Sequence, residues 1–124
     1  MAGSVLSRLA PLVRIAFWVA MVFAITMAVL PKPPHLGLEP LGDKVQHMIA
    51  FGVLALLAQT GFNGTPRWQI AERLSFLGAM IELVQSIPAL HRDCDIKDWI
   101  ADTVVVVIVT ALFALRGVPR RRRR

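Results

Sequence analysis

Apolar residues gather in four long stretches, and short segments rich in proline, glycine and charge separate them. The stretches cover about residues 9–30, 43–62, 70–90 and 99–115. A helix rises ~1.5 Å per residue and needs ~20 residues to cross the ~30 Å hydrocarbon core of a bilayer, a length that each stretch approaches or exceeds. The pattern predicts an all-α, polytopic membrane protein with four transmembrane helices, and the short loops predict a small antiparallel bundle.

Turn and cap residues mark the ends of these helices. Pro31, Pro33 and Pro34 end the first helix, because proline cannot continue the hydrogen-bond ladder. Asp43 is a suitable N-cap for the second helix, and residues 63–66 (Asn-Gly-Thr-Pro) are typical of a turn. Four small residues are placed to allow close approach between helices: Gly52, Ala55, Gly78 and Ala79.

Composition agrees with a membrane protein. Of the 124 residues, 56% are hydrophobic and 18% are charged, and the mean hydropathy is +0.60. A soluble domain of this size carries fewer apolar and more charged residues. The length fits one membrane domain over residues 1–124. A cleaved signal peptide is an alternative for the first stretch, but residues 27–30 lack a small-x-small cleavage site, so we favour an uncleaved anchor.

The basic residues predict the orientation of the chain in the cytoplasmic (inner) membrane. With both termini cytoplasmic, ten basic residues lie inside and four outside, in agreement with the positive-inside rule. Five of the ten form the run Arg120–Arg124 within the basic tail, residues 116–124. Because the tail directly follows a predicted span, we expect it to contact anionic lipid headgroups rather than nucleic acid. A flank that only fixes the topology is an equally good explanation.

Polar residues at the ends of the apolar stretches form the most informative pattern. If the helices alternate in direction, eight of them reach one region near the outer membrane face. Ionisable groups at membrane depth cost roughly 2.5–3.5 kcal/mol each, so such a group of residues indicates a functional site. We expect a ligand-binding pocket formed by Asp43, Lys44, His47, Glu82, Gln85, Arg92, Asp98 and Asp102.

Several of these residues also have ordinary structural explanations. Asp43 and Asp98 fit helix caps, and a lone histidine such as His47 is more often a packing residue than a ligand. Glu82 is harder to explain, since it precedes Pro88 by six residues and is expected ~9 Å inside the helix end. There it needs an opposite charge or a proton. A purely structural polar network is therefore an open alternative.

Known catalytic and cofactor motifs are missing from the chain. It has no phosphate-binding glycine loop, no nucleophile elbow and no paired Cys-x-x-Cys, and its one cysteine, Cys94, is most simply a bystander. Only His47 is well placed as a nitrogen ligand, so we expect neither a metal nor another cofactor. His47 and Glu82 are candidates for acid–base catalysis, and Arg92 is the natural contact for phosphate or carboxylate.

Two short motifs that contain the expected pocket residues resemble those of the VanZ-like family. The first is Asp43-Lys44-x-x-His47, and the second is Glu82-x-x-Gln85 followed by Pro88, Arg92 and Asp98. The similarity covers about residues 41–112. Asp102 and Val105 stand where the family often has asparagine and glycine. The resemblance implies a small integral membrane protein, and the family's namesake is associated with resistance to the glycopeptide antibiotic teicoplanin.

Three functions fit these observations. The first is binding of an anionic lipid or cell-envelope precursor headgroup in the outer pocket, with a role in the envelope or glycopeptide-antibiotic response. The second is an enzyme that acts on a lipid-linked substrate by acid–base chemistry. The third is a structural or assembly protein with a polar network. Whether the chain is an enzyme stays open at this point.

Overall fold

The computed structural model describes residues 2–29, 42–88 and 96–116 of the chain, with side chains from residue 8 in the first range and from residue 45 in the second. These residues form four α-helices and no strand, so the expected all-helical fold is confirmed. The helices are α1 (Ala2–Val29), α2 (Gly42–Gly61), α3 (Arg67–Gln85) and α4 (Ile96–Leu115).

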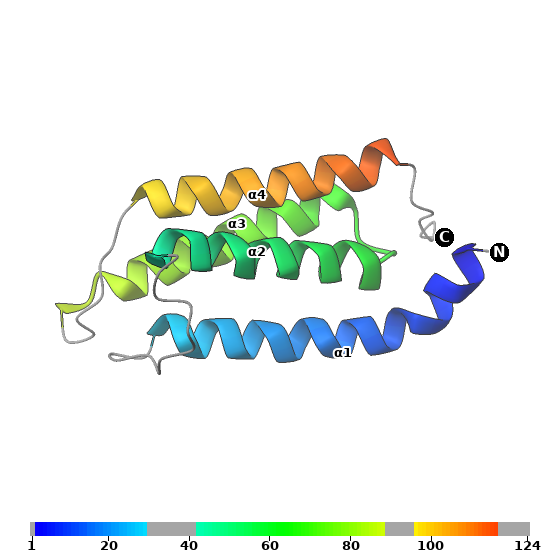
Figure 1. Ribbon diagram of the computed structural model, residues 1–124, viewed down its shortest axis with the longest axis horizontal. Helices are drawn as coiled ribbons and strands as arrows, with labels where there is room; N and C mark the ends of the chain where they lie inside the picture. Colours follow the sequence, from blue (N-terminus) through cyan, green and yellow to red (C-terminus); the bar gives the residue numbers. More distant parts are fainter. Residues whose placement is uncertain (1, 30–41, 89–95, 117–124) are drawn as a thin grey trace.

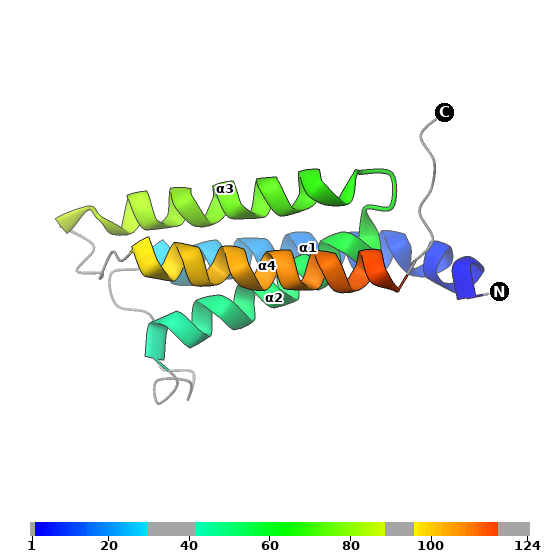
Figure 2. The ribbon, with the colours of Figure 1, turned by 90° about the horizontal axis from the view of Figure 1, so that it is seen from above.

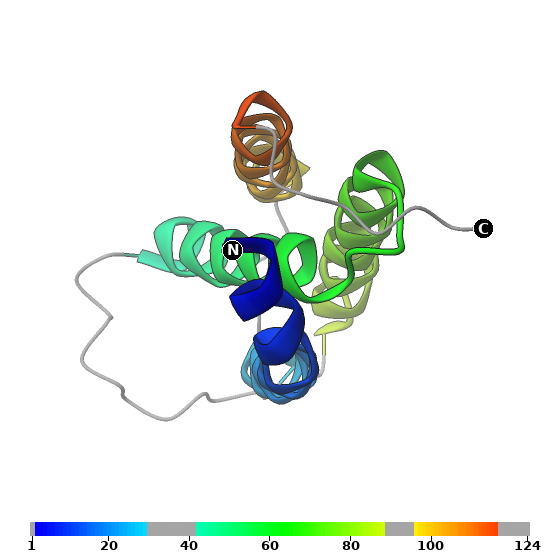
Figure 3. The same ribbon diagram turned by 90° about the vertical axis from the view of Figure 1, so that its right-hand side faces the viewer.

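The helices alternate in direction and pack as a bundle (Figure 1). Helix α2 contacts all three others, and in two views it lies between α1 and α4 (Figures 1 and 3). Helix α3 packs mainly against α4 and lies to one side of it in the view from above (Figure 2). One end of the bundle therefore combines the starts of α2 and α4 with the ends of α1 and α3. We call it the site end.

Helix boundaries differ from the expected ones in ways that matter for the site. Helix α3 ends at Gln85 rather than at residue 90. After Ser86 the i→i−4 pattern gives way to a tighter turn, in which the Ile87 N–H donates to the Val84 carbonyl at 3.1 Å, and Pro88 follows. Glu82 thus lies in the last turn of α3, and the expected ~9 Å depth was too large. Helix α4 begins at Ile96, so Asp98 lies inside its first turn and is not the N-cap.

The first helix is longer than expected. Helix α1 begins at Ala2 rather than near residue 9, and it continues through Pro11. Proline removes one backbone hydrogen bond and is a common cause of helix bending. Figure 1 shows α1 bent in its N-terminal part, the part that contains Pro11.

Small residues let the helices approach closely, as the sequence predicts. A Cβ atom on Gly52 would lie 3.3 Å from Val105 on α4, and one on Gly78 would lie 3.3 Å from Trp99. Ala55 is completely buried beside Leu54 in the centre of the bundle. The two glycines leave room for side chains of the neighbouring helices, Val105 against Gly52 and the rings of Trp99 and Phe51 against Gly78.

The outer surface of the bundle is apolar. Two helical segments, Arg8–Val29 and Ile96–Leu115, are long and apolar enough to cross a membrane, and only 11% of each is buried inside the protein. Helix α3 also exposes large apolar side chains, among them Trp68, Phe76 and Leu83. Most residues of these two segments thus face outward, unlike those in the core helix of a soluble protein, although the bundle also has a buried apolar core around Leu54 and Val106.

Candidate functional site

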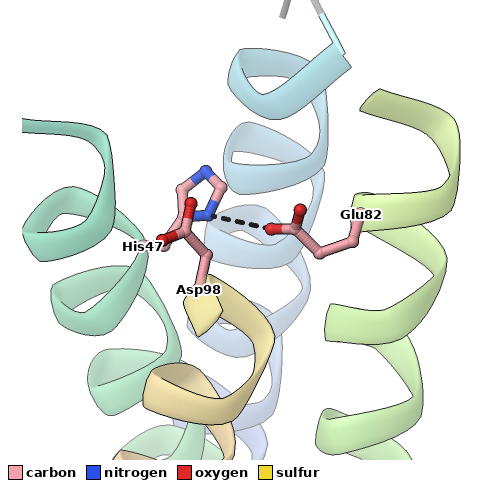
Figure 4. Close-up of side chains that lie close together, drawn as sticks. All are labelled: His47, Glu82 and Asp98. Carbon is pink, nitrogen blue, oxygen red and sulfur yellow. Dashed lines mark ion pairs between the residues drawn. The ribbon is translucent and has the colours of Figure 1, made fainter. Parts of the chain in front are cut away.

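Three helices bring ionisable side chains together at the site end. His47 lies in the second turn of α2, Glu82 in the last turn of α3 and Asp98 in the first turn of α4. Figure 4 shows these three side chains pointing toward one another. Asp102 follows Asp98 by four residues, which places both on one face of α4. We call these four residues the acidic cluster.

His47 lies at the centre of the acidic cluster. Its Nδ1 atom is 4.0 Å from Glu82 Oε1 and 3.9 Å from Asp102 Oδ2. One potential ligand atom from each of His47, Glu82 and Asp98 lies within 4.8 Å of the other two. These distances exceed those of a hydrogen bond, so His47 Nδ1 is not hydrogen-bonded to either carboxyl group.

The carboxyl groups of the acidic cluster are shielded from the surroundings. The residue exposures are 6% for Glu82, 8% for Asp98 and 2% for Asp102, and the His47 side chain is 15% exposed. Burying an ion costs several kcal/mol unless opposite charge or hydrogen bonds compensate. A buried group of three carboxyls and one imidazole therefore favours protons, a cation or the positive part of a ligand.

Hydrogen bonding within the acidic cluster is incomplete. Among the residues that the structure describes, His47 Nδ1 and Asp102 Oδ1 have no hydrogen-bond partner, although both atoms are buried. In native proteins about nine in ten buried polar atoms have a partner, so each exception calls for an explanation. The amide oxygens of Gln59 and Gln85 also lack a hydrogen-bond partner among the described residues, but only in the acidic cluster do two such atoms, His47 Nδ1 and Asp102 Oδ1, belong to neighbouring ionisable side chains.

Gln85 lies at the site end but is held by the helix bundle. It is 2% exposed, and its Nε2 donates a hydrogen bond of 3.0 Å to the backbone carbonyl of Ala28 near the end of α1. This hydrogen bond joins α3 to α1. Its Oε1 makes no hydrogen bond to any residue that the structure describes.

Three expected pocket residues cannot be placed in the same way. Asp43 and Lys44 belong to the first turn of α2, but their side chains are outside the described part of the structure. Arg92 lies outside the described residues altogether. Their contribution to the pocket stays a prediction. The four members of the acidic cluster are the expected residues that the structure brings together.

Sequence reasoning missed a second polar network near the opposite end. Gln59 is 2% exposed, and its Nε2 donates to Thr110 on α4 at 3.2 Å and to the carbonyl of Arg67 at 3.3 Å. A glutamine inside the apolar run of α2 was the available signal. Because these bonds link three successive elements of the bundle, we assign the network a structural role.

An apolar pocket of about 150 Å³ also lies away from the acidic cluster. Phe17, Trp18 and Phe62 line it with edge-to-face ring contacts, and Arg73 and Thr65 are its polar contributors. It holds no pair of groups for acid–base chemistry.

The proposed acid–base pair is not hydrogen-bonded. The 4.0 Å between His47 Nδ1 and Glu82 Oε1 is longer than the ~2.6–3.2 Å over which a base takes a proton directly. The arrangement suits recognition of a positive centre better than direct proton transfer between these two residues.

Comparisons with known proteins add no identity. No family model matches the chain, and no curated protein or solved structure is significantly similar to it. The resemblance to the VanZ-like family stays a prediction from the two motifs. The function must therefore be argued from the site itself.

Proposed function

We propose that this chain is an integral protein of the cytoplasmic membrane whose site end binds the headgroup of an anionic lipid or a cell-envelope precursor. In this proposal all four helices span the bilayer, both termini are cytoplasmic and the site end lies near the outer face. The observation that carries the proposal is a buried acidic cluster inside a bundle with an apolar exterior. In this proposal the cluster contacts a positive part of the headgroup, whereas the anionic part is left to the basic residues Lys44 and Arg92.

The apolar exterior supports insertion of the whole bundle. Helices α1 and α4 meet the length and hydropathy of a span, and α2 and α3 pack between and beside them. The segment Val45–Gly61 of α2 is shorter, and α3 carries charges at its ends. In the proposal these two helices cross as part of the bundle, because their buried polar residues Gln59, Glu82 and Gln85 face other helices rather than lipid. The exposed residues Glu72 and Arg73 lie within about two turns of the start of α3, which the proposal places at the cytoplasmic surface.

The position of the acidic cluster supports headgroup recognition. Its side chains lie about one to two turns from the helix ends, a depth at which a lipid-linked headgroup is within reach. In the sequence, Lys44 belongs to the first turn of α2, and Arg92 lies between α3 and α4, outside the described residues. The proposal assigns both to the site end. Positive charge from these residues would compensate the carboxyls and contact phosphate or carboxylate.

Native mass spectrometry of the protein purified in mild detergent tests this function. Wild type is compared with the double variant Glu82→Gln, Arg92→Ala. The matched control is Glu72→Gln, Arg116→Ala, which makes the same charge changes at exposed positions. We expect a defined lipid or precursor adduct on wild type and control, and its loss from the double variant at equal folding.

Equal adducts on all three proteins would contradict headgroup binding at the site end. In that case the acidic cluster would be a structural network. A substrate that still binds to Glu82→Gln but is no longer converted would instead indicate an enzyme with Glu82 as acid or base.

A further inference from the structure

We propose that the acidic cluster is a binding site for a divalent transition-metal ion of the Zn²⁺ or Mn²⁺ class. The ligands are Nδ1 of His47 and carboxylate oxygens of Glu82, Asp98 and Asp102, contributed by three helices. Figure 4 shows three of these side chains converging from α2, α3 and α4. The three side chains already point toward a common region, so each can reach a shared ion from its own helix.

The donor types select the class of ion. One imidazole nitrogen favours zinc and other transition metals, whereas carboxylates also accept manganese, magnesium and calcium. The mixture of one nitrogen with several carboxylate oxygens is typical of Zn²⁺ and Mn²⁺ and less so of Ca²⁺ and Mg²⁺, which prefer oxygen alone. The absence of any thiolate among the four residues argues against a soft ion such as Cu⁺.

The spacing of the donors fits an ion after a small contraction. A triangle with sides between the 4.0 Å of the His47–Glu82 pair and the 4.8 Å limit of the group has corners about 2.3–2.8 Å from its centre, against ~2.0–2.2 Å for Zn²⁺ bonds. Each ligand atom therefore moves inward by a few tenths of an ångström. Changes of side-chain torsion angles within one rotamer supply a movement of this size.

Asp102 provides a second, independent observation in favour of a bound ion. It is 2% exposed, one oxygen lies 3.9 Å from His47 Nδ1, and its Oδ1 makes no hydrogen bond to any described residue. His47 Nδ1 is likewise buried without a hydrogen bond among the described residues, and it faces the carboxylates. A metal ion would satisfy the nitrogen and the oxygens together.

A bound ion would also explain how an acidic site accepts an anion. Two positive charges would offset two carboxylates, and an open coordination position would bind a phosphate or carboxylate oxygen. In this bridging role the ion links the carboxylates of the acidic cluster to the anionic headgroup. The bridging role rests on the proposed headgroup function, whereas the metal site does not.

Metal analysis of the purified full-length protein tests the site. The protein is loaded with Zn²⁺ or Mn²⁺, freed of loose metal by gel filtration and measured by inductively coupled plasma mass spectrometry. Competition with a chelating indicator then gives the dissociation constant. We expect about one ion per wild-type chain, and affinity at least about tenfold weaker in Asp102→Asn and His47→Gln. Glu72→Gln, an exposed carboxylate change on α3, should keep wild-type affinity.

Failure of the site and failure of the function give different results. Wild-type protein with no more metal than a detergent blank would overturn the metal site, whatever the variants do. Equal affinity in wild type and Asp102→Asn would also overturn it, because the ion would then bind elsewhere. Bound metal together with a lipid adduct that survives chelation by EDTA would overturn the bridging role. Bound metal without any specific lipid would overturn the headgroup function and leave the metal site in place.

Discussion

Replacing Asp102 by asparagine should stabilise the metal-free protein while weakening the site. Asparagine keeps the size and shape of the side chain but removes a carboxylate that is 2% exposed. In the metal-free protein this carboxylate shares one histidine nitrogen with Glu82 and has a second acid, Asp98, one turn away. The change therefore relieves repulsion among like charges and reduces the cost of burying them.

The magnitude follows from the distances. Glu82 Oε1 and Asp102 Oδ2 lie 4.0 and 3.9 Å from the same nitrogen, so they are at most about 8 Å apart. At this largest separation and an effective dielectric constant of ~20, two unit charges repel by about 2 kcal/mol, and a shorter separation increases the repulsion. For a chain of this size that corresponds to a melting temperature higher by on the order of 5–10 °C.

Thermal unfolding in detergent with EDTA, followed by circular dichroism at pH 8, measures this effect. We expect Asp102→Asn to melt above wild type without metal. We also expect added metal to raise the melting temperature of wild type and not that of Asp102→Asn. The control Glu72→Gln is exposed and should change stability by no more than ~0.5 kcal/mol. A lower melting temperature for Asp102→Asn in EDTA would refute the reasoning, because it would show that the carboxylate is already compensated within the fold.

Two further predictions concern topology and packing. A cysteine at position 92, in a background with Cys94→Ser, should react with a membrane-impermeant maleimide on intact cells; labelling only after permeabilisation would invert the proposed orientation. Gly78→Leu should destabilise the bundle by about 1–3 kcal/mol, because even a Cβ atom there would lie 3.3 Å from Trp99, whose Nε1 donates to the Ser75 carbonyl at 2.9 Å. Gly64→Leu is the matched control, since nothing lies within 4 Å of a Cβ atom at that position, and equal unfolding temperatures for the two variants would contradict the tight packing at Gly78.

The sequence by itself determined that the fold is helical and that successive helices run in opposite directions. Four apolar stretches with proline and glycine between them predicted four antiparallel helices, and the structure has four in its described part. Alternating direction was enough to bring the starts of α2 and α4 and the end of α3 to one end. His47, Glu82, Asp98 and Asp102 could therefore be assigned to one site, because periodicity and connectivity are properties of the chain alone.

Only the tertiary structure decided what this site contains. Helix α3 ends at Gln85 and α4 begins at Ile96, so Glu82 lies in the last turn of α3 and Asp98 is a buried member of the acidic cluster instead of a cap. The separation of side chains depends on helix rotation and packing, which close contacts at Gly52 and Gly78 set and which no local pattern encodes. Those contacts place a histidine nitrogen about 4 Å from two carboxylates. The sequence indicated which ionisable residues lie at the site end. The packing of the helices brings their side chains close enough together to form a potential metal site.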